Sequence, residues 1–196
     1  MPITHQEPPR DTLETLREAA ETMPQAYAHN AKMIRDVLDD LDRHWPHPVY
    51  IAGLKDMAAS GGLSKAEMIG WRYLAQSGSD RNYAIEVQED PDGTGHQVAE
   101  LDKGPFIDGI YRVLEDKSIA QKAGETDLKL SVLRINAMGI FAVWLRADDS
   151  DKEIIIPVQP APEYLKPWHA YSVEEFEDAL KPEAKRDLKP GRSFDA

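Results

Sequence analysis

The strongest constraint in the sequence is the apolar run from Ile140 to Leu145, which is flanked by turn-forming residues on both sides. Both faces of this segment are apolar, and a strand that is covered on both faces belongs in the centre of a sheet. Further apolar segments lie next to it at residues 128–135 and 153–158. We therefore predict a three-stranded antiparallel meander over residues 128–158, with residues 140–146 as its central strand.

Alternation of apolar and polar residues predicts a second group of strands. Residues 83–88 alternate in this way, which is typical of a half-buried strand. Residues 90–95 are dense in turn formers, so residues 96–101 are expected to return as the second strand of a hairpin. A further short strand is expected at residues 49–52.

Helix-start signals predict three helices after residue 63. Ser64 and Glu67 have the spacing of a capping box ahead of an apolar run, which predicts a helix that ends near residues 77–79. A proline begins the next expected helix, over residues 105–121. A second capping-box spacing, at Ser172, begins the last one.

The N-terminal part of the chain predicts a pair of helices over residues 11–45. The second helix carries an apolar stripe at a period of 3.6 residues, from Tyr27 through Ile34 to Leu41. Such a stripe must be covered. Either the sheet of the same chain covers it, or a neighbouring copy or another protein does.

Together these patterns predict an α+β fold, an antiparallel sheet of about five strands with packed helices, preceded by the N-terminal helical pair. The expected divisions are a disordered lead at 1–10, the helical pair at 11–45, the α+β domain at 49–188 and a loose tail at 189–196.

Charge and hydropathy exclude several classes of partner. The 196 residues include 23 Lys and Arg against 35 Asp and Glu, so the formal net charge is −12. Nucleic-acid binding draws much of its affinity from phosphate neutralisation, which this charge opposes. No apolar run approaches the roughly 20 residues that a membrane helix needs, and no signal peptide begins the chain. We expect a soluble, cytoplasmic protein without nucleic-acid or membrane partners.

Signatures of chemistry are incomplete. Cysteine is absent, which excludes disulfides, thiolate metal sites and cysteine nucleophiles. His44 and His47 have the spacing of metal ligands on a helix, but Pro46 between them breaks that geometry. The acidic, glycine-bearing segment 89–96 departs from the calcium-loop pattern. We assign no catalytic residue, cofactor or metal ligand, and the sequence favours a non-catalytic protein.

The aromatic residues of a proline-punctuated segment are the better candidates for contact with a partner. Tyr164, Trp168 and Tyr171 lie where neither a helix nor a strand period is visible. Exposed aromatic residues in irregular segments are typical of interfaces, although the same rings could instead complete the core. Together with the stripe of the second helix, the candidate partner-binding residues are Tyr164, Trp168, Tyr171, Tyr27, Ile34 and Leu41.

Two functions follow from these observations. The first is an acidic protein-interaction module, such as an adaptor, a chaperone-like factor, an inhibitor or an immunity-type factor, with another protein or a second copy as its partner. The alternative is a small-molecule-binding domain, or an enzyme, with a pocket between the helix at 105–121 and the strands at 128–158. A cavity in that place with buried polar groups converging on it would favour the alternative.

Overall fold

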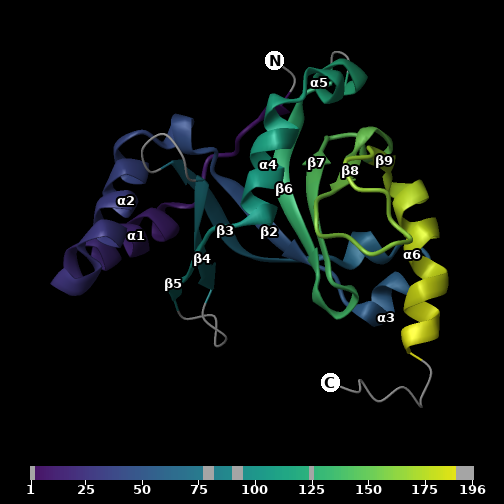
Figure 1. Cartoon of the computed structure of the whole chain (residues 1–196), viewed down its shortest axis with the longest axis horizontal. Helices are drawn as coiled ribbons and strands as arrows, with labels where there is room; N and C mark the ends of the chain where they lie inside the picture. The colour runs from purple at the N-terminus through teal and green to yellow at the C-terminus, as the bar shows by residue number, and fades with distance from the viewer. Residues whose placement is uncertain (1–2, 77–81, 90–94, 124–125, 189–196) are drawn as a thin grey trace.

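The computed structural model of the chain describes residues 3–76, 82–89, 95–123 and 126–188. Within these residues the fold is α+β, with helices packed on both faces of one mostly antiparallel sheet of nine strands (Figure 1). The α-helices are α1 (Arg10–Thr22), α2 (Ala28–Asp39), α3 (Leu54–Met57), α4 (Pro105–Glu115), α5 (Lys117–Ala123) and α6 (Val173–Asp187). The strands are β1 (Ile3–Thr4), β2 (His47–Ile51), β3 (Glu67–Gln76), β4 (Asn82–Glu89), β5 (His96–Asp102), β6 (Leu128–Ile135), β7 (Ile140–Arg146), β8 (Ile154–Pro157) and β9 (Tyr171–Ser172).

The order of strands in the sheet is β5-β4-β3-β2-β6-β7-β8-β9. Neighbours along this path are antiparallel except β2 and β6, which are parallel. β1 adds a second parallel partner to β6. The meander over residues 128–158 is confirmed as β6-β7-β8, and β7 is its central strand. The sheet thus consists of two antiparallel groups that meet at the parallel pair.

The helix predicted from the capping box at Ser64 is wrong, because those residues lead into strand β3. The Ser64 hydroxyl donates to the carbonyl of Gly61 instead of capping a helix. From Gly70 onward the side chains alternate between the two faces of the sheet, and β3 pairs with β4 along seven residues. A Cβ added at Gly70 would lie 2.3 Å from the carbonyl oxygen of Val87. This close approach between β3 and β4 suits glycine, and the tertiary pairing outweighs the local helix signal. The extra strand helps to raise the total above the expected five.

The expectation of a disordered lead does not hold at Ile3 and Thr4, which form β1. Ile3 is buried against the core, and β1 pairs with Leu128 and Lys129 of β6. Gln6 extends this attachment, since its Nε2 donates to the carbonyl of Leu130 at 3.0 Å.

The turn predicted at 90–95 lies almost wholly outside the described residues, as do the predicted helix end at 77–79 and the tail at 189–196.

Helices α1 and α2 cover one face of the β3–β4 part of the sheet. Leu16 of α1 and Ile34 of α2 are fully buried in a cluster with Tyr73 and Ile85 of the sheet. The Tyr73 hydroxyl lies 2.7 Å from Oγ1 of Thr12, a buried residue of α1. The apolar stripe of the second helix is therefore covered by the sheet of its own chain.

The remaining helices cover the rest of the sheet. Helices α3 and α6 pack on the face of β6–β8 that continues the side covered by α1 and α2. As predicted, Ser172 and Glu175 form a capping box at the start of α6. Helix α4 lies on the opposite face, in front of the sheet in Figure 1, and buries Ile107, Ile110 and Val113 there.

The covered stripe of α2 gives a direct test by substitution. Ile34→Ala should lower the free energy of unfolding by about 2–5 kcal/mol, because it leaves a cavity in a packed core. The control is Tyr27→Ala, which truncates a side chain that is 57% exposed and should change that free energy by less than about 0.5 kcal/mol. Urea titration of both variants measures the difference. Equal, small effects would show that α2 does not pack on its own sheet.

Candidate functional site

A buried group of charged side chains lies on the α4 face of the sheet, and we call it the arginine–glutamate cluster: Arg72, Glu86, Arg134 and Glu100. Nε and Nη2 of Arg72 donate to Oε2 of Glu86 at 2.9 and 2.6 Å. Nη1 and Nη2 of Arg134 donate to Oε1 and Oε2 of the same carboxylate at 3.1 and 2.7 Å. Arg72 is 0% exposed and Glu86 1% exposed, so both charges are removed from water.

The register of the sheet explains how these residues meet. Arg72 of β3 is the direct partner of Glu86 on β4, and Glu86 is the direct partner of Glu100 on β5. Arg134 comes from β6, and β2 and β3 lie between β6 and β4 in the sheet. A guanidinium on β6 can reach Glu86 only if the sheet curls toward this face. The cluster therefore joins the two halves of the sheet across a concave surface.

The electrostatics of the cluster keep it ionised. Burial raises the pKa of the Glu86 carboxyl, but the charges of Arg72 and Arg134 and the hydrogen bonds outweigh burial, so the net shift is downward. Burial lowers the pKa of the Arg72 guanidinium, and Glu86 opposes that change. An arginine begins from so high a pKa that it stays protonated. Glu86 thus accepts from two cations, and Gln88 Nε2 donates to it as well, at 2.5 Å.

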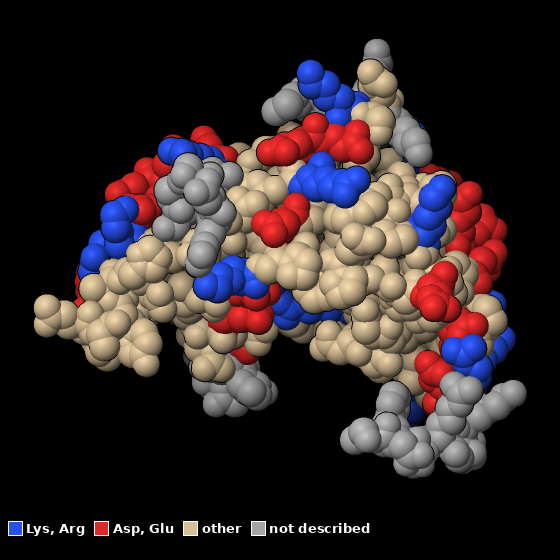
Figure 2. All heavy atoms as spheres, in the orientation of Figure 1, with Lys and Arg blue, Asp and Glu red and all other residues tan. Residues whose placement is uncertain are grey.

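Beside this cluster the surface is hollowed between the start of α4, β5 and the β6–β7 turn. We call this cavity of about 430 Å³ the α4–β7 hollow. Figure 2 shows acidic and basic side chains together in a recess below the middle of this face. The rings of Phe106 and Phe141 are stacked in its wall, with centroids 4.7 Å apart. The lining residues are Glu100, Asp102, Phe106, Arg134, Asn136, Gly139, Ile140 and Phe141.

A buried donor of the arginine–glutamate cluster is unsatisfied. Nη1 of Arg72 is buried and has no hydrogen-bond partner among the residues that the structure describes. The Arg72 guanidinium lies 5.4 Å from the centroid of the Phe141 ring, and that of Arg134 lies 5.8 Å from it. Attraction between a cation and the face of an aromatic ring partly offsets the missing hydrogen bond. Phe141 therefore links the buried cluster to the wall of the hollow.

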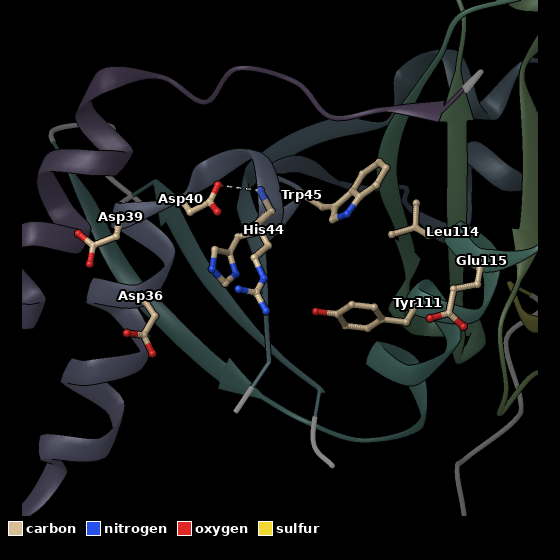
Figure 3. Close-up of a pocket in the computed structure, with 9 residues that line it drawn as sticks. Asp36, Asp39, Asp40, His44, Trp45, Tyr111, Leu114 and Glu115 are labelled. Atoms are coloured by element: carbon tan, nitrogen blue, oxygen red, sulfur yellow. Dashed lines mark hydrogen bonds between the residues drawn. The ribbon is translucent and has the colours of Figure 1, made fainter. Parts of the chain in front are cut away.

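A second cavity, of about 550 Å³, lies between α2, α4 and the 3-10 turn η2 (Leu41–His44), and we call it the acidic cleft. In Figure 3 the carboxylates of Asp36 and Asp39 on α2 lie across it from Tyr111 and Glu115 on α4. Burial raises the pKa of Tyr111 to about 12, with a small opposing effect of Arg43. The lining residues are Asp36, Asp39, Asp40, Arg43, His44, Trp45, Tyr111, Leu114 and Glu115.

The two histidines with metal-ligand spacing are held apart by different backbone contacts. Nδ1 of His44 donates to the carbonyl of Leu74 at 2.7 Å, and Nδ1 of His47 donates to that of Trp45 at 2.6 Å. Burial lowers the pKa of His47 to about 3, the hydrogen bond to Trp45 opposes this shift, and the charge of Arg72 adds to it. Across the described part of the chain, no group of three or more His, Asp or Glu side chains has a geometry that could hold a metal ion.

The predicted partner-binding residues do not gather on one surface. Ile34 is buried in the core, Tyr27 is exposed, and Leu41 is half-buried at η2. The three aromatic residues of the segment after β8 are half-buried: Tyr164, Trp168 and Tyr171. Tyr164 and Tyr171 pack on the α6 side of the sheet, and Trp168 packs on the α4 side, so their rings extend the two cores as the alternative interpretation expected.

The arginine–glutamate cluster was missed at the level of sequence, although it left a signal there. Arg134 has the same strand phase as Leu130 and Val132 in the most apolar region of the chain. Glu86 likewise shares the phase of Ala84. A charged residue at a core-facing position of a strand marks a buried polar site, because such a charge must be paired. Only the sheet order, with β2 inserted between β3 and β6, brings the two signals together.

Comparisons with known proteins give no relative: no family model, no curated protein and no solved structure matches the chain. Among the described residues, no helix combines the length and the apolar composition that crossing a bilayer requires. The geometry of the two cavities and of the buried cluster is therefore what bears on function.

The neutral, buried imidazole of His47 predicts a specific sensitivity to acid. Above its ordinary pKa of 6.5 the folded and unfolded chains both carry it neutral. As pH falls from 6.5 toward 3, only the unfolded chain takes up a proton there, so the free energy of unfolding decreases. Between pH 7 and pH 5 this group should account for a loss of about 2 kcal/mol.

Urea titrations at the two pH values test this. His47→Asn keeps a donor near Nδ1 and should show about 2 kcal/mol less acid destabilisation than the unsubstituted chain. His169→Asn, at an exposed histidine, should retain the original pH dependence. An unchanged pH dependence in His47→Asn would mean that His47 can be protonated in the folded chain.

Proposed function

We propose that this protein is a small-molecule-binding domain whose ligand occupies the α4–β7 hollow. The observation that carries the proposal is the buried arginine–glutamate cluster beside a cavity between α4 and the β6–β7 hairpin. That is the place where a pocket was expected if the chain bound a small molecule. A concave site with an apolar wall and a few converging polar groups is typical of ligand pockets, and about 430 Å³ lies within their usual range.

The energetics of buried charges support this interpretation. Removing two guanidinium groups and a carboxylate from water costs several kcal/mol per ion, and their mutual attraction often does no more than repay it. Well-packed apolar side chains would fill the same space at no such cost. Arg72 and Glu86 are instead held rigidly next to a cavity. Charged groups whose positions are fixed before binding favour specific recognition of a ligand.

A protein-interaction module is the second candidate, and the acidic cleft favours it. Asp39 and Glu115 are exposed on opposite walls of this cleft, with Tyr111 between them. The formal charge of −12 suits a basic partner. In this alternative, lysine or arginine side chains of the partner occupy the acidic cleft, and the α4–β7 hollow plays no part.

Blocking the hollow tests the first proposal. A fragment library is screened against the full chain by NMR of its methyl groups, with Ile140 as the reporter of the hollow. Asn136→Trp adds bulk to the lining and should abolish the binding of fragments that shift Ile140. Ala137→Trp places the same bulk on the same turn, η4 (Asn136–Met138), at an exposed residue outside the lining, and should leave binding intact.

The contrary results are distinct. Fragments whose binding survives Asn136→Trp would bind elsewhere, and a library that shifts no resonance of the hollow would count against a ligand site there. If shifts gather instead at Leu114, in particular with a lysine-rich peptide as the probe, the acidic cleft is the binding site and the second candidate is favoured.

A further inference from the structure

We infer that the α4–β7 hollow takes a small organic cation, an amine or guanidinium group carried on a flat apolar body. This inference rests on the proposed function of the hollow and adds the chemical class of its ligand. It follows from which polar groups of the hollow already have hydrogen-bond partners, which do not, and which aromatic rings form its apolar wall.

The guanidinium group that lines the hollow, that of Arg134, is already engaged. The buried Nη1 of Arg72, which has no hydrogen-bond partner among the described residues, lies outside the lining. Nη2 of Arg134 donates to Glu86 at 2.7 Å and to Glu100 at 3.3 Å, and Nη1 donates to Glu86 at 3.1 Å. Arg134 therefore has two carboxylates as neighbours. An anionic ligand would have to compete with Glu86 for the guanidinium group of Arg134. The carboxylate of Glu86 is 1% exposed, so water could not replace Arg134 as its partner. Recognition of a carboxylate or phosphate ligand is disfavoured for this reason.

The acceptors of the hollow, in contrast, are open. Glu100 and Asp102 lie two residues apart on β5 and face the hollow, because they are the register partners of Glu86 and Ala84 on the α4 face. Glu100 is 43% exposed and engages Arg134 and Arg72 through Oε2, which leaves Oε1 without a partner among the described residues. Within the described residues, Asp102 makes no side-chain hydrogen bond or ion pair. Open carboxylate oxygens at a partly desolvated site favour a ligand that donates hydrogen bonds and carries positive charge.

The charge balance points the same way. Arg134, Glu100 and Asp102 line the hollow, and the buried guanidinium group of Arg72 and carboxylate of Glu86 lie behind them in the arginine–glutamate cluster. Two positive charges against three negative charges leave an excess of one negative charge. A monovalent cation neutralises the site, whereas an anion would double its excess charge. The metal-ion alternative lacks the required cluster of ligands in the described residues.

The wall of the hollow determines the shape of the body that carries the cation. The ring of Phe106 is half-buried and stacks on Phe141 with an angle of 18° between the ring planes. A flat ligand can continue this stack, with its charged group turned toward Glu100 and Asp102. Aromatic stacking adds to burial of apolar area, and the face of an aromatic ring also attracts a cation. The volume of about 430 Å³ limits the ligand to a small molecule.

Three probes of the same shape test the inference on the full chain: benzamidinium, benzamide and benzoate, which differ in charge. Each is titrated to about 10 mM, where ligands of this size bind measurably, and Ile140 methyl shifts report the hollow. Benzamidinium should bind on the order of tenfold tighter than benzamide, because an ion pair with a carboxylate adds to the shared stacking. Benzoate should not bind.

Two double variants, one in the hollow and one in the acidic cleft, show where benzamidinium binds. Glu100→Gln with Asp102→Asn should weaken benzamidinium on the order of tenfold and leave benzamide unchanged. Asp39→Asn with Glu115→Gln removes the same number of charges from the acidic cleft and should leave both affinities unchanged. If this second pair weakens benzamidinium and the first does not, the cation binds in the acidic cleft, and the inference fails.

The remaining outcomes separate the inference from the function on which it rests. Tighter binding of benzamide or benzoate in the hollow would keep the proposed ligand site and overturn its preference for cations. Absence of any shift at Ile140 with all three probes would overturn the preference and the ligand site together.

Discussion

The pairing of the buried Glu86 carboxylate depends on the curvature of the sheet. This carboxylate accepts hydrogen bonds from Arg72 on the neighbouring strand and from Arg134 three strands away along the sheet. An unpaired carboxylate in this position would lose several kcal/mol of solvation, so Glu86 can be buried here only because the curl of the sheet brings both guanidinium groups to it. The concave face that results receives α4 over its apolar part and leaves the α4–β7 hollow next to the charges.

The two faces of the sheet are covered in different ways, and the difference leads to the proposed site. On one face, α1 and α2 on one half and α3 and α6 on the other bury continuous apolar clusters. On the opposite face, α4 covers the apolar residues but stops short of the arginine–glutamate cluster. The N-terminal end of α4, at Phe106, therefore forms one wall of the hollow, and Phe141 joins it to the buried charges.

The sequence predicted the strand that is apolar on both faces and the helix that begins with a capping box. The two-faced run at 140–145 identified the central strand β7, and the capping box at Ser172 identified the start of α6. Residues 67–76 were misassigned because Ser64 and Glu67 imitate a capping box, whereas the pairing of β3 with β4 is a long-range interaction. The cluster was beyond reach for a related reason. Arg72 and Glu86 meet across the neighbouring strands β3 and β4, but Arg134 follows Glu86 by 48 residues, and only the strand order β4-β3-β2-β6 brings it to them.

If the arginine–glutamate cluster is retained for ligand recognition, as we propose, it should add no net stability to the fold. Unfolding free energies of two variants test this expectation most directly. Glu86→Leu alone leaves Arg72 and Arg134 with only the half-exposed carboxylate of Glu100 as a partner and should cost about 3–5 kcal/mol. Glu86→Leu combined with Arg72→Met and Arg134→Met should unfold within about 1 kcal/mol of the original chain. A triple variant that is as unstable as the single one would contradict this expectation, because the charges would then be required for the fold itself.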